Sequence, residues 1–450
     1  TGWHWEFGDG ATSEERNPIH VYRTPGTYTV SLTASNAAGS NTGTMTDYIT
    51  VMAPPSIADF EANVTAGAAP LTVEFTDTST GDPDGWAWYF GDEGFTGPWT
   101  VLNTSTLWDG GRQRERCGHS SVALPDGSIV LMGGRSSYYE DDYRNDVWRS
   151  TDNGATWEEM TESAEWSARS GHASVVLSDG SIILMGGEDD SDCKSDVWRS
   201  SDKGATWELV SESAEWSVRT DHSSVVLPDG SILLMGGNYV RGYISDYKND
   251  VWRSRDGGET WTRVTASAAW SRRIGHTCVV LSDGSIILMG GFSGTSKDDW
   301  KNDVWRSDDG GETWTEVTSS AEWAERHKHT SVVLPDESII VMGGVSGDYA
   351  RNYGDYKNDV WRSVNGGATW IQITAHAGRV MQRYGHSSVV LPDGSIVTMG
   401  GTSSSGYGVS RVETAGSMEE HPVHTYTMPG NYTVSLITTT AGSSSKATKS

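Results

Sequence analysis

The sequence predicts an all-β fold: a six-bladed β-propeller inserted into a β-sandwich and preceded by another sandwich-like module. Three observations lead to this prediction. A unit of about 50 residues recurs six times, each unit contains four short strand-like segments, and related segments flank the repeats on both sides. The composition agrees, because 53 glycines in 450 residues indicate many tight turns and 21 tryptophans indicate aromatic packing between short strands.

Composition and charge argue against several function classes. The 60 acidic residues outnumber the 33 basic ones, and the net charge of -27 disfavours nucleic acid or an anionic membrane surface as a partner. No apolar run approaches the roughly 20 residues of a membrane span. Three cysteines (Cys117, Cys193 and Cys278) cannot form a disulfide framework and match no zinc signature. The abundance of Ser, Thr, Asn and Gly favours an extracellular or cell-surface location.

Six histidines mark the starts of the repeats, 50 to 57 residues apart: His119, His172, His222, His276, His329 and His386. The four strands of a unit are named a, b, c and d in chain order. Strand a reads H-x-S-V-V-L, which is apolar and β-branched as a buried strand should be. A P-D-G-S or S-D-G-S turn follows, whose Asp-Gly pair we expect to supply the positive-φ residues of a two-residue hairpin. Strand b is S-I-I-L-M-G-G and strand c is N-D-V-W-R-S.

Strands c and d are separated by the motif S-x-D-x-G-x-T-W, at 150–157, 200–207, 254–261 and 307–314. Its Asp can accept backbone N–H groups, its Gly can adopt a positive φ, and its Trp can anchor strand d. In the fifth unit Asn365 replaces the Asp and keeps an acceptor oxygen. The sixth unit lacks a d strand, but residues 97–102 imitate one. We therefore expect this N-terminal strand to close the ring in a composite last blade.

Two families of propeller repeat resemble this pattern. The R-x-x-H element, the D-G turn, the G-G pair and the later Trp are similar to kelch repeats. The motif S-x-D-x-G-x-T-W resembles the Asp-box of sialidase-type propellers. Both resemblances imply a β-propeller and cover most of residues 97–416.

The flanking segments resemble the PKD domain, an immunoglobulin-like sandwich common on archaeal and bacterial cell-surface proteins. Residues 1–53 contain W-H-W-E-F-G-D-G and P-G-T-Y-T-V-S-L. A second copy starts near Pro55, stops after G-W-A-W-Y-F-G-D-E at 85–93, and resumes with H-P-V-H-T-Y at 421–426. The predicted domains are a PKD-like sandwich without its first strands at 1–54, the first half of a second PKD-like sandwich at 55–96, the six-bladed propeller at 97–416, and the second half of that sandwich at 417–450.

The predicted order of strands also orients the propeller. The chain enters it at the start of a d strand and leaves at the end of a c strand, so both points should lie on the face that carries the a–b and c–d turns. The face formed by the b–c connections should point away from the sandwiches. Each sandwich lacks strands that the other copy has. Either the chain is cut from a longer array, or neighbouring copies supply the strands and form a filament, array or surface coat.

The R-x-x-H elements place six arginines and six histidines near one end of the ring, where they could bind an anion. Because the element is the same in every blade, we favour a structural role, with His bonding the neighbouring blade's backbone and Arg pairing with the acidic N-D of strand c. The tryptophans of strand c and of the Asp-box are interpreted as blade packing. Sialidase-type and copper-oxidase-type chemistries need ligand or nucleophile sets that this sequence does not assemble, so we predict no catalytic residue, no metal and no cofactor.

The b–c connections vary in length and carry aromatic and acidic residues. Such aromatic residues suit contacts with glycans or protein partners, although the alternative is a set of solvated loops. The candidate contact residues are Tyr138, Tyr139, Tyr239, Tyr243, Trp300, Tyr349 and Tyr353. The Asp-rich loops also offer carboxylates to calcium, although no EF-hand spacing is present. Sequons for N-glycosylation occur at Asn63, Asn103 and Asn431.

Together these resemblances imply an archaeal-type cell-surface protein with PKD domains and a kelch-like, Asp-box propeller. We expect a non-catalytic structural or adhesive protein of the cell surface. Its expected partners are copies of itself, through the incomplete sandwich ends, and surface glycans or other surface proteins. The alternative is a secreted glycan-active enzyme, sialidase-like or of another carbohydrate-processing type, that uses the propeller channel. An asymmetric pocket with paired carboxylates or a metal cluster on the b–c face would favour the enzyme.

Overall fold

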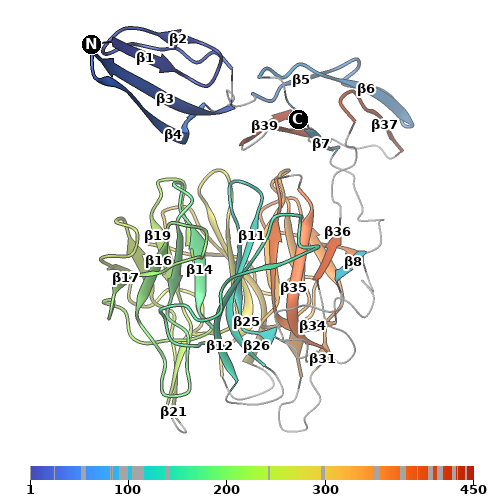
Figure 1. Cartoon of the computed structure of the whole chain (residues 1–450). Coiled ribbons are helices and arrows are strands. Elements are labelled where there is room, and N and C mark those ends of the chain that lie inside the picture. Colours follow the sequence, from blue (N-terminus) through green and yellow to red (C-terminus); the bar gives the residue numbers. More distant parts are fainter. Residues whose placement is uncertain are drawn as a thin grey trace.

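The computed structural model of the chain is all-β (Figure 1). It describes residues 2–24, 26–51, 57–81, 83, 85–90, 100–103, 116–136, 142–241, 244–294, 299–347, 355–374, 382–392, 394–403, 409–412, 419–427, 432, 434–440 and 443–449. Within these ranges no helix is long and apolar enough to cross a lipid bilayer.

The first module is a single four-stranded sheet. It contains β1 (Gly2–Glu6), β2 (Thr12–Ser13), β3 (Gly26–Asn36) and β4 (Gly39–Val51), in the order β2-β1-β3-β4. Four of the nine large hydrophobic side chains that are exposed among the described residues lie in this module: Ile19, Val21, Met45 and Tyr48. Because no second sheet covers it among those residues, this module has only a partial core.

The second module consists of two three-stranded sheets. One sheet has the order β37-β6-β5, with β5 (Phe60–Ala62), β6 (Leu71–Asp77) and β37 (Val423–Tyr426). The other has the order β39-β38-β7, with β7 (Gly85–Tyr89), β38 (Val434–Thr440) and β39 (Ser443–Lys449). Both sheets therefore pair strands from before and after the long central segment, and the side chains between them include Phe60, Phe75, Trp88 and Leu436, all at most 3% exposed.

The two modules share the same internal contacts. In the first, the Trp5 indole donates to the carbonyl of Glu15 and the Tyr22 hydroxyl donates to the carbonyl of Phe7. In the second, the corresponding bonds join Trp88 to Glu419 and Tyr426 to Phe90. The same stack of Phe, His and two Tyr rings follows in each: Phe7, His20, Tyr22 and Tyr28, and then Phe90, His424, Tyr426 and Tyr432. Residues on either side of the central segment thus reproduce contacts made within the uninterrupted first module.

Between these halves, the described residues form six four-stranded antiparallel sheets. Sheet 1 has β10 (Ser120–Ala123), β11 (Ile129–Ser136), β12 (Tyr143–Ser150) and β13 (Glu158–Thr161), and β9 (Arg116–Cys117) also pairs with β11. Sheet 2 has β14 (Ala173–Val176), β15 (Ile182–Met185), β16 (Val197–Ser200) and β17 (Glu208–Ser211). Sheet 3 has β18 (Ser223–Val226), β19 (Ile232–Met235), β22 (Val251–Ser254) and β23 (Thr262–Thr265).

The remaining sheets follow the same order. Sheet 4 has β24 (Thr277–Val280), β25 (Ile286–Phe292), β26 (Trp300–Ser307) and β27 (Thr315–Thr318). Sheet 5 has β28 (Thr330–Val333), β29 (Ile339–Met342), β32 (Val360–Ser363) and β33 (Ile371–Thr374). Sheet 6 has β34 (Arg383–Val390), β35 (Ile396–Ser403), β36 (Val409–Val412) and β8 (Thr100–Asn103). Two small hairpins extend the b–c connections, β20 (Asn238–Arg241) with β21 (Ile244–Tyr247), and β30 (Val345–Ser346) with β31 (Asp355–Tyr356).

The six sheets close into a ring. Their inner strands β10, β14, β18, β24, β28 and β34 contact one another in cyclic order, and the last contacts the first. In sheet 6 the outer strand is β8, which precedes the other three in the chain by about 280 residues or more and pairs antiparallel with β36 through Ser410 and Val101. This is the N-terminal strand that the sequence was expected to supply.

A ring of backbone hydrogen bonds surrounds the axis. The residue before each repeat histidine donates its N–H to the carbonyl of the equivalent residue in the preceding sheet, with N–O distances of 2.8 to 3.0 Å. All six residues have a positive φ between 50° and 65°: Gly118, Gly171, Asp221, Gly275, Lys328 and Gly385. Positive φ is favoured for glycine, so Asp221 and Lys328 are the two ring positions that carry backbone strain.

The a–b turns differ from the predicted two-residue hairpins. In sheet 1 the Leu124 N–H bonds the carbonyl of Ser128, and the Gly127 N–H bonds the carbonyl of Leu124. Three residues therefore form the loop, and only Gly127 has a positive φ, of 80°. The prediction was wrong because Pro-Asp-Gly also fits a type I turn followed by a left-handed glycine, which is the usual three-residue hairpin.

In the a–b turn of sheet 5, a residue other than glycine has the positive φ, and this residue contacts the second module. Glu337 occupies the glycine position of its a–b turn with a φ of 68°. Its carboxylate accepts the Ser282 N–H of the neighbouring turn at 3.0 Å and the Lys446 ammonium of β39 at 2.9 Å. Nearby, Tyr89 of β7 is 1% exposed, and its hydroxyl abuts Gly394 in the a–b turn of sheet 6. The second module thus rests on the a–b turns, and Figure 1 shows hairpin strand β21 at the opposite end of the ring.

We predict that Glu337→Gly loosens the second module without destabilising the ring. The change relieves about 1 kcal/mol of backbone strain, while the partly exposed pair with Lys446 contributes only about 0.2–1 kcal/mol. Distances between spin labels on the two parts should therefore broaden while the melting temperature changes little. Lys446→Met, which leaves the turn intact, should broaden the distances equally, and narrow distributions in both variants would contradict this role of Glu337.

Candidate functional site

The repeated arginines are buried structural residues. Five of them form bidentate pairs with the Asp of strand c, at N–O distances of 2.6 to 2.9 Å: Arg116 with Asp146, Arg169 with Asp196, Arg219 with Asp250, Arg273 with Asp303, and Arg326 with Asp359. Each also donates to the carbonyl of the first glycine in its G-G pair. The predicted pairing with the N-D element is confirmed, and at 0–4% exposure these guanidinium groups do not present an anion site.

Three of the six repeated histidines bond to the neighbouring sheet. Nε2 of His329 lies 2.9 Å from the Thr277 hydroxyl of the preceding sheet, and His386 and His119 make the same contact with Thr330 and Ser387. The expected contact with the neighbouring sheet is therefore present, although in these three it is made to a side-chain hydroxyl. Burial and the adjacent arginine charge lower the pKa of His172 to about 3, so its imidazole is neutral in the folded protein.

The S-x-D-x-G-x-T-W turns are also structural. In the first, the Asp152 carboxylate accepts the N–H and the hydroxyl of Thr156 and the hydroxyl of Ser150, and the Trp157 indole donates to the carbonyl of Gly154. Asn365 Oδ1 accepts the Thr369 N–H in the same way, as its acceptor oxygen predicted, whereas its Nδ2 donates to the Thr369 hydroxyl.

Four buried tryptophans were not singled out from the sequence. They belong to the A-E-W or A-A-W segment after strand d, and each meets the Asp-box Trp of the next sheet edge-on at 5.9 to 6.1 Å: Trp166 with Trp207, Trp216 with Trp261, Trp270 with Trp314, and Trp323 with Trp370. The sequence signal that could have identified these tryptophans is that their segment recurs with the same period as the other motifs.

Charged residues that differ from sheet to sheet lie at the end of the axis where the six R-x-x-H segments and the b–c connections meet. We call this end of the axis the axial mouth and define it by Arg135, Glu188, Asp221 and Lys328. Arg135 and Glu188 directly follow the G-G pairs of sheets 1 and 2, and Asp221 and Lys328 are ring residues of sheets 3 and 5. Four sheets that are alike elsewhere therefore contribute a different charged side chain each.

The four charges of the axial mouth act on one another. The Lys328 ammonium lies 2.9 Å from the Asp221 carboxylate, and the Arg135 guanidinium lies 3.6 Å from the Glu188 carboxylate. Burial and the Asp221 charge raise the pKa of Glu188. Burial alone would raise the pKa of Asp221, but Lys328 holds it below its ordinary value. The side chains are 19–36% exposed, so solvent or a ligand can reach them.

The loop aromatics are placed only in part. Tyr138, Tyr139, Tyr243, Tyr349 and Tyr353 lie outside the described residues, as does Asn431. Tyr239 is half-buried on β20, and Asn63 is exposed. Trp300 is 4% exposed and packs against Phe292 and His327, so the expectation that it offers its ring to a ligand is wrong.

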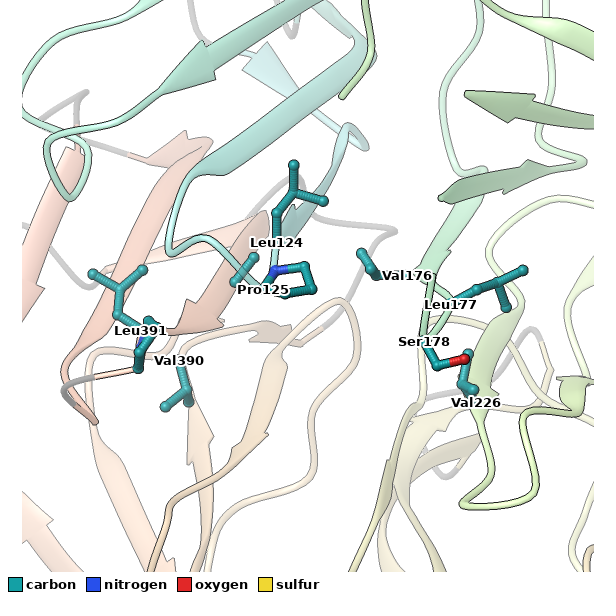
Figure 2. Close-up of a pocket in the computed structure, with 10 residues that line it drawn as sticks. Leu124, Pro125, Val176, Leu177, Ser178, Val226, Val390 and Leu391 are labelled. Atoms are coloured by element: carbon teal, nitrogen blue, oxygen red, sulfur yellow. The ribbon is translucent and has the colours of Figure 1, made fainter. Parts of the chain in front are cut away.

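A metal site and an apolar cavity were the other candidates for a functional site. Across the described residues, no three His, Cys, Asp or Glu side chains are grouped so as to hold a metal ion. A cavity of about 460 Å³ lies among the a–b turns, and Figure 2 shows Leu124, Pro125, Leu177 and Leu391 around it. Its lining is almost wholly apolar, so the axial mouth is the candidate functional site.

Comparisons with known proteins agree with the two kinds of module. The family described as the KLHDC2/KLHL20/DRC7 Kelch-repeats domain matches residues 96–291 and 215–401, and the PKD domain family matches residues 1–51. A solved structure titled "Structure of YjhT" has a TM-score of 0.51 at 14% identity and covers 74% of this chain and 97% of that one. At this identity, the likeness shows the fold alone.

Similar curated proteins match only over segments. Collagenase ColA of Bacillus cereus is 46% identical over 55 residues, 12% of this chain and 6% of the collagenase. A xyloglucanase of Paenibacillus sp. is 29% identical over 163 residues, 32% of this chain and 15% of the xyloglucanase. The aligned part of the chain thus spans a small fraction of either relative.

We predict that acid destabilises the ring between pH 6.5 and 5. Folding holds His172, His222 and His276 at a pKa of about 3, against 6.5 unfolded, so below pH 6.5 the unfolded chain binds more protons. Stability is full above pH 6.5 and falls by up to about 1.4 kcal/mol per pH unit for each such histidine. Denaturant unfolding at pH 7, 6 and 5 measures how the free energy of unfolding changes with pH. His222→Gln should reduce this slope by the contribution of one histidine, up to about 1.4 kcal/mol per pH unit. A slope of zero would contradict neutral histidines.

Proposed function

Because the chain belongs to the Kelch-repeat family and carries a PKD domain, we propose that it is a non-catalytic, extracellular surface protein that displays a binding propeller. In this proposal the six sheets are the blades of a propeller inserted into a loop of the second PKD-like sandwich. The sandwiches are the structural part and the propeller is the recognition part. The resemblance of the PKD modules supports the proposal of a position on a cell surface, of archaeal type.

The insertion is supported by the contacts that the two modules share. Trp88 bonds to Glu419 across 331 positions, as Trp5 bonds to Glu15 across 10 positions. An insertion of this kind is tolerated where the entry and exit of the inserted domain lie close together.

The display function rests on one difference between the two ends of the ring: one end contacts the second module, and the other presents partly exposed charges. At the a–b end, Glu337 and Gly394 contact the second module through Lys446 and Tyr89. At the b–c end lies the axial mouth with four partly exposed charges, and the b–c connections differ in length in the sequence. Repeated elements hold the ring together, and the four charged residues that break the repeat at the axial mouth lie at the end that faces away from the sandwiches, where surface glycans or other surface proteins would bind.

The exposed apolar side chains of the first module support self-association. Trp5 is half-buried there, whereas its counterpart Trp88 is fully buried beneath the β37-β6-β5 sheet. We propose that a second copy covers this open sheet and that repetition of the contact gives a filament, array or coat.

We predict that replacing Met45 and Tyr48 by Glu weakens self-association at least tenfold. Both side chains are more than half exposed, so the folded module should tolerate the change. Analytical ultracentrifugation measures the association constant, and a double substitution of the exposed Leu209 and Ile371 on the propeller is the control. Equal weakening by the control, or no association in the unchanged protein, would contradict the proposal.

A glycan-active enzyme is the second candidate function. Two carboxylates, Glu188 and Asp221, interact in the axial mouth, and their surroundings move their pKa values in opposite directions, as in many acid–base pairs. The segment similar to a xyloglucanase points the same way. Against catalysis, Asp221 is held in an ion pair by Lys328.

Incubation with xyloglucan and other oligosaccharides distinguishes the two candidates. For a binding protein, we expect saturable binding at the axial mouth and recovery of every glycan intact by mass spectrometry. Shortened products that disappear in Glu188→Gln would favour the enzyme. If no polysaccharide, oligosaccharide or surface-protein extract binds to the b–c end, the display function is wrong.

A further inference from the structure

We infer that the axial mouth binds a small zwitterion of the α-amino acid class, with its carboxylate at Arg135 and its ammonium at Glu188. This inference rests on the proposal that the b–c end of the ring is the binding end, and it names the chemical class of the ligand.

Arg135 differs from every structural arginine of the ring. Those arginines are 0–4% exposed, and five of them form bidentate bonds to carboxylates. The Arg135 side chain is 36% exposed, and its nearest Glu188 oxygen, at 3.6 Å, is beyond hydrogen-bond distance. Arg135 also makes a hydrogen bond with Tyr143, whose ring centroid lies 5.9 Å from the guanidinium carbon. Its remaining N–H donors are available to a carboxylate from outside, which guanidinium groups bind in bidentate fashion.

The backbone strain of the axial ring is also confined to this site. Gly occupies four of the six ring positions, whereas Asp221 and Lys328 adopt φ values of 53° and 50°. These two residues bond to each other across the axis at 2.9 Å. Strained non-glycine residues tend to cluster at functional sites, and here they add one further anion and one further cation beside Arg135 and Glu188.

Two buried acceptors next to Asp221 have no donor from the protein. Thr220 and Asn238 are each 4% exposed, and their Oγ1 and Oδ1 atoms have no hydrogen-bond partner. Thr220 Oγ1 lies against Gly171, where an added Cβ would come within 2.1 Å of it. Both atoms are closed to solvent, so a ligand in the mouth would reach them only through an ordered water, which would also satisfy them.

The balance of charge selects a zwitterion over a simple ion. Two cations and two anions make the mouth neutral as a whole. After burial, the Asp221 charge raises the pKa of Glu188, and Arg135 and Lys328 lower it. A lone anion would also meet Glu188 and Asp221, and a lone cation would also meet Arg135 and Lys328. A molecule with both charges close together can meet an opposite charge at each end.

Titration of the whole chain with glycine, followed by ligand-observed NMR, tests the inference. Glycine should bind saturably, whereas acetate, methylammonium and glucose should each bind at least tenfold more weakly. Arg135→Gln and Glu188→Gln should each weaken glycine binding at least tenfold. Arg272→Gln is the matched control, because this arginine is 65% exposed, lies near Asp246 of the β20–β21 hairpin and is not part of the mouth.

The ligand series on the unchanged protein keeps the test independent of how the variants fold. If glucose binds the axial mouth as tightly as glycine, or if neither Gln variant weakens glycine binding, the inference is wrong while the proposed display function stands. If no ligand of any class binds at the b–c end, the inference and the proposed function both fail.

Discussion

The ring of six backbone hydrogen bonds at the axis constrains most of the propeller. Each N–H must reach the carbonyl of the neighbouring sheet, which requires a positive φ directly before every repeat histidine. That requirement fixes the placement of the arginine three positions before the histidine, and of the carboxylate with which it pairs. Because backbone atoms make these bonds, a residue other than glycine can occupy such a position at the cost of backbone strain, and two of the six are not glycine.

The same ring therefore contains residues that repeat in every sheet and residues that occur in one sheet only. The Arg–Asp pairs, the histidine contacts and the paired tryptophans lie between sheets and repeat because every sheet has two equivalent neighbours. Arg135 and Glu188, which directly follow two of the G-G pairs, lie instead at the axial mouth on the axis of the ring. Arg135 and Glu188 occupy equivalent positions in adjacent sheets and carry opposite charges. Side chains at the mouth are therefore not constrained by the repeat.

Sequence reasoning succeeded where the signal was periodic. The six units, the Asp-box turns and the N-terminal strand β8 of sheet 6 could all be derived by comparing copies. The axial mouth could not, because Arg135, Glu188, Asp221 and Lys328 occur once each and lie far apart in the chain. The available signal was the loss of glycine before His222 and His329. Trp300 was misjudged for a related reason: it lies in an acidic loop sequence, but it begins β26 and packs on Phe292.

The split second module has a consequence for synthesis of the chain. Trp88 leaves the ribosome 331 residues before Glu419, its hydrogen-bond partner. At typical translation rates this interval is roughly 15–65 s. During that time Phe60, Phe75 and Trp88 form an apolar surface without its opposing strands. The completed ring, which brings residue 103 beside residue 409, is what finally holds the two halves within reach of each other. Biogenesis of the sandwich is thus timed by biogenesis of the propeller.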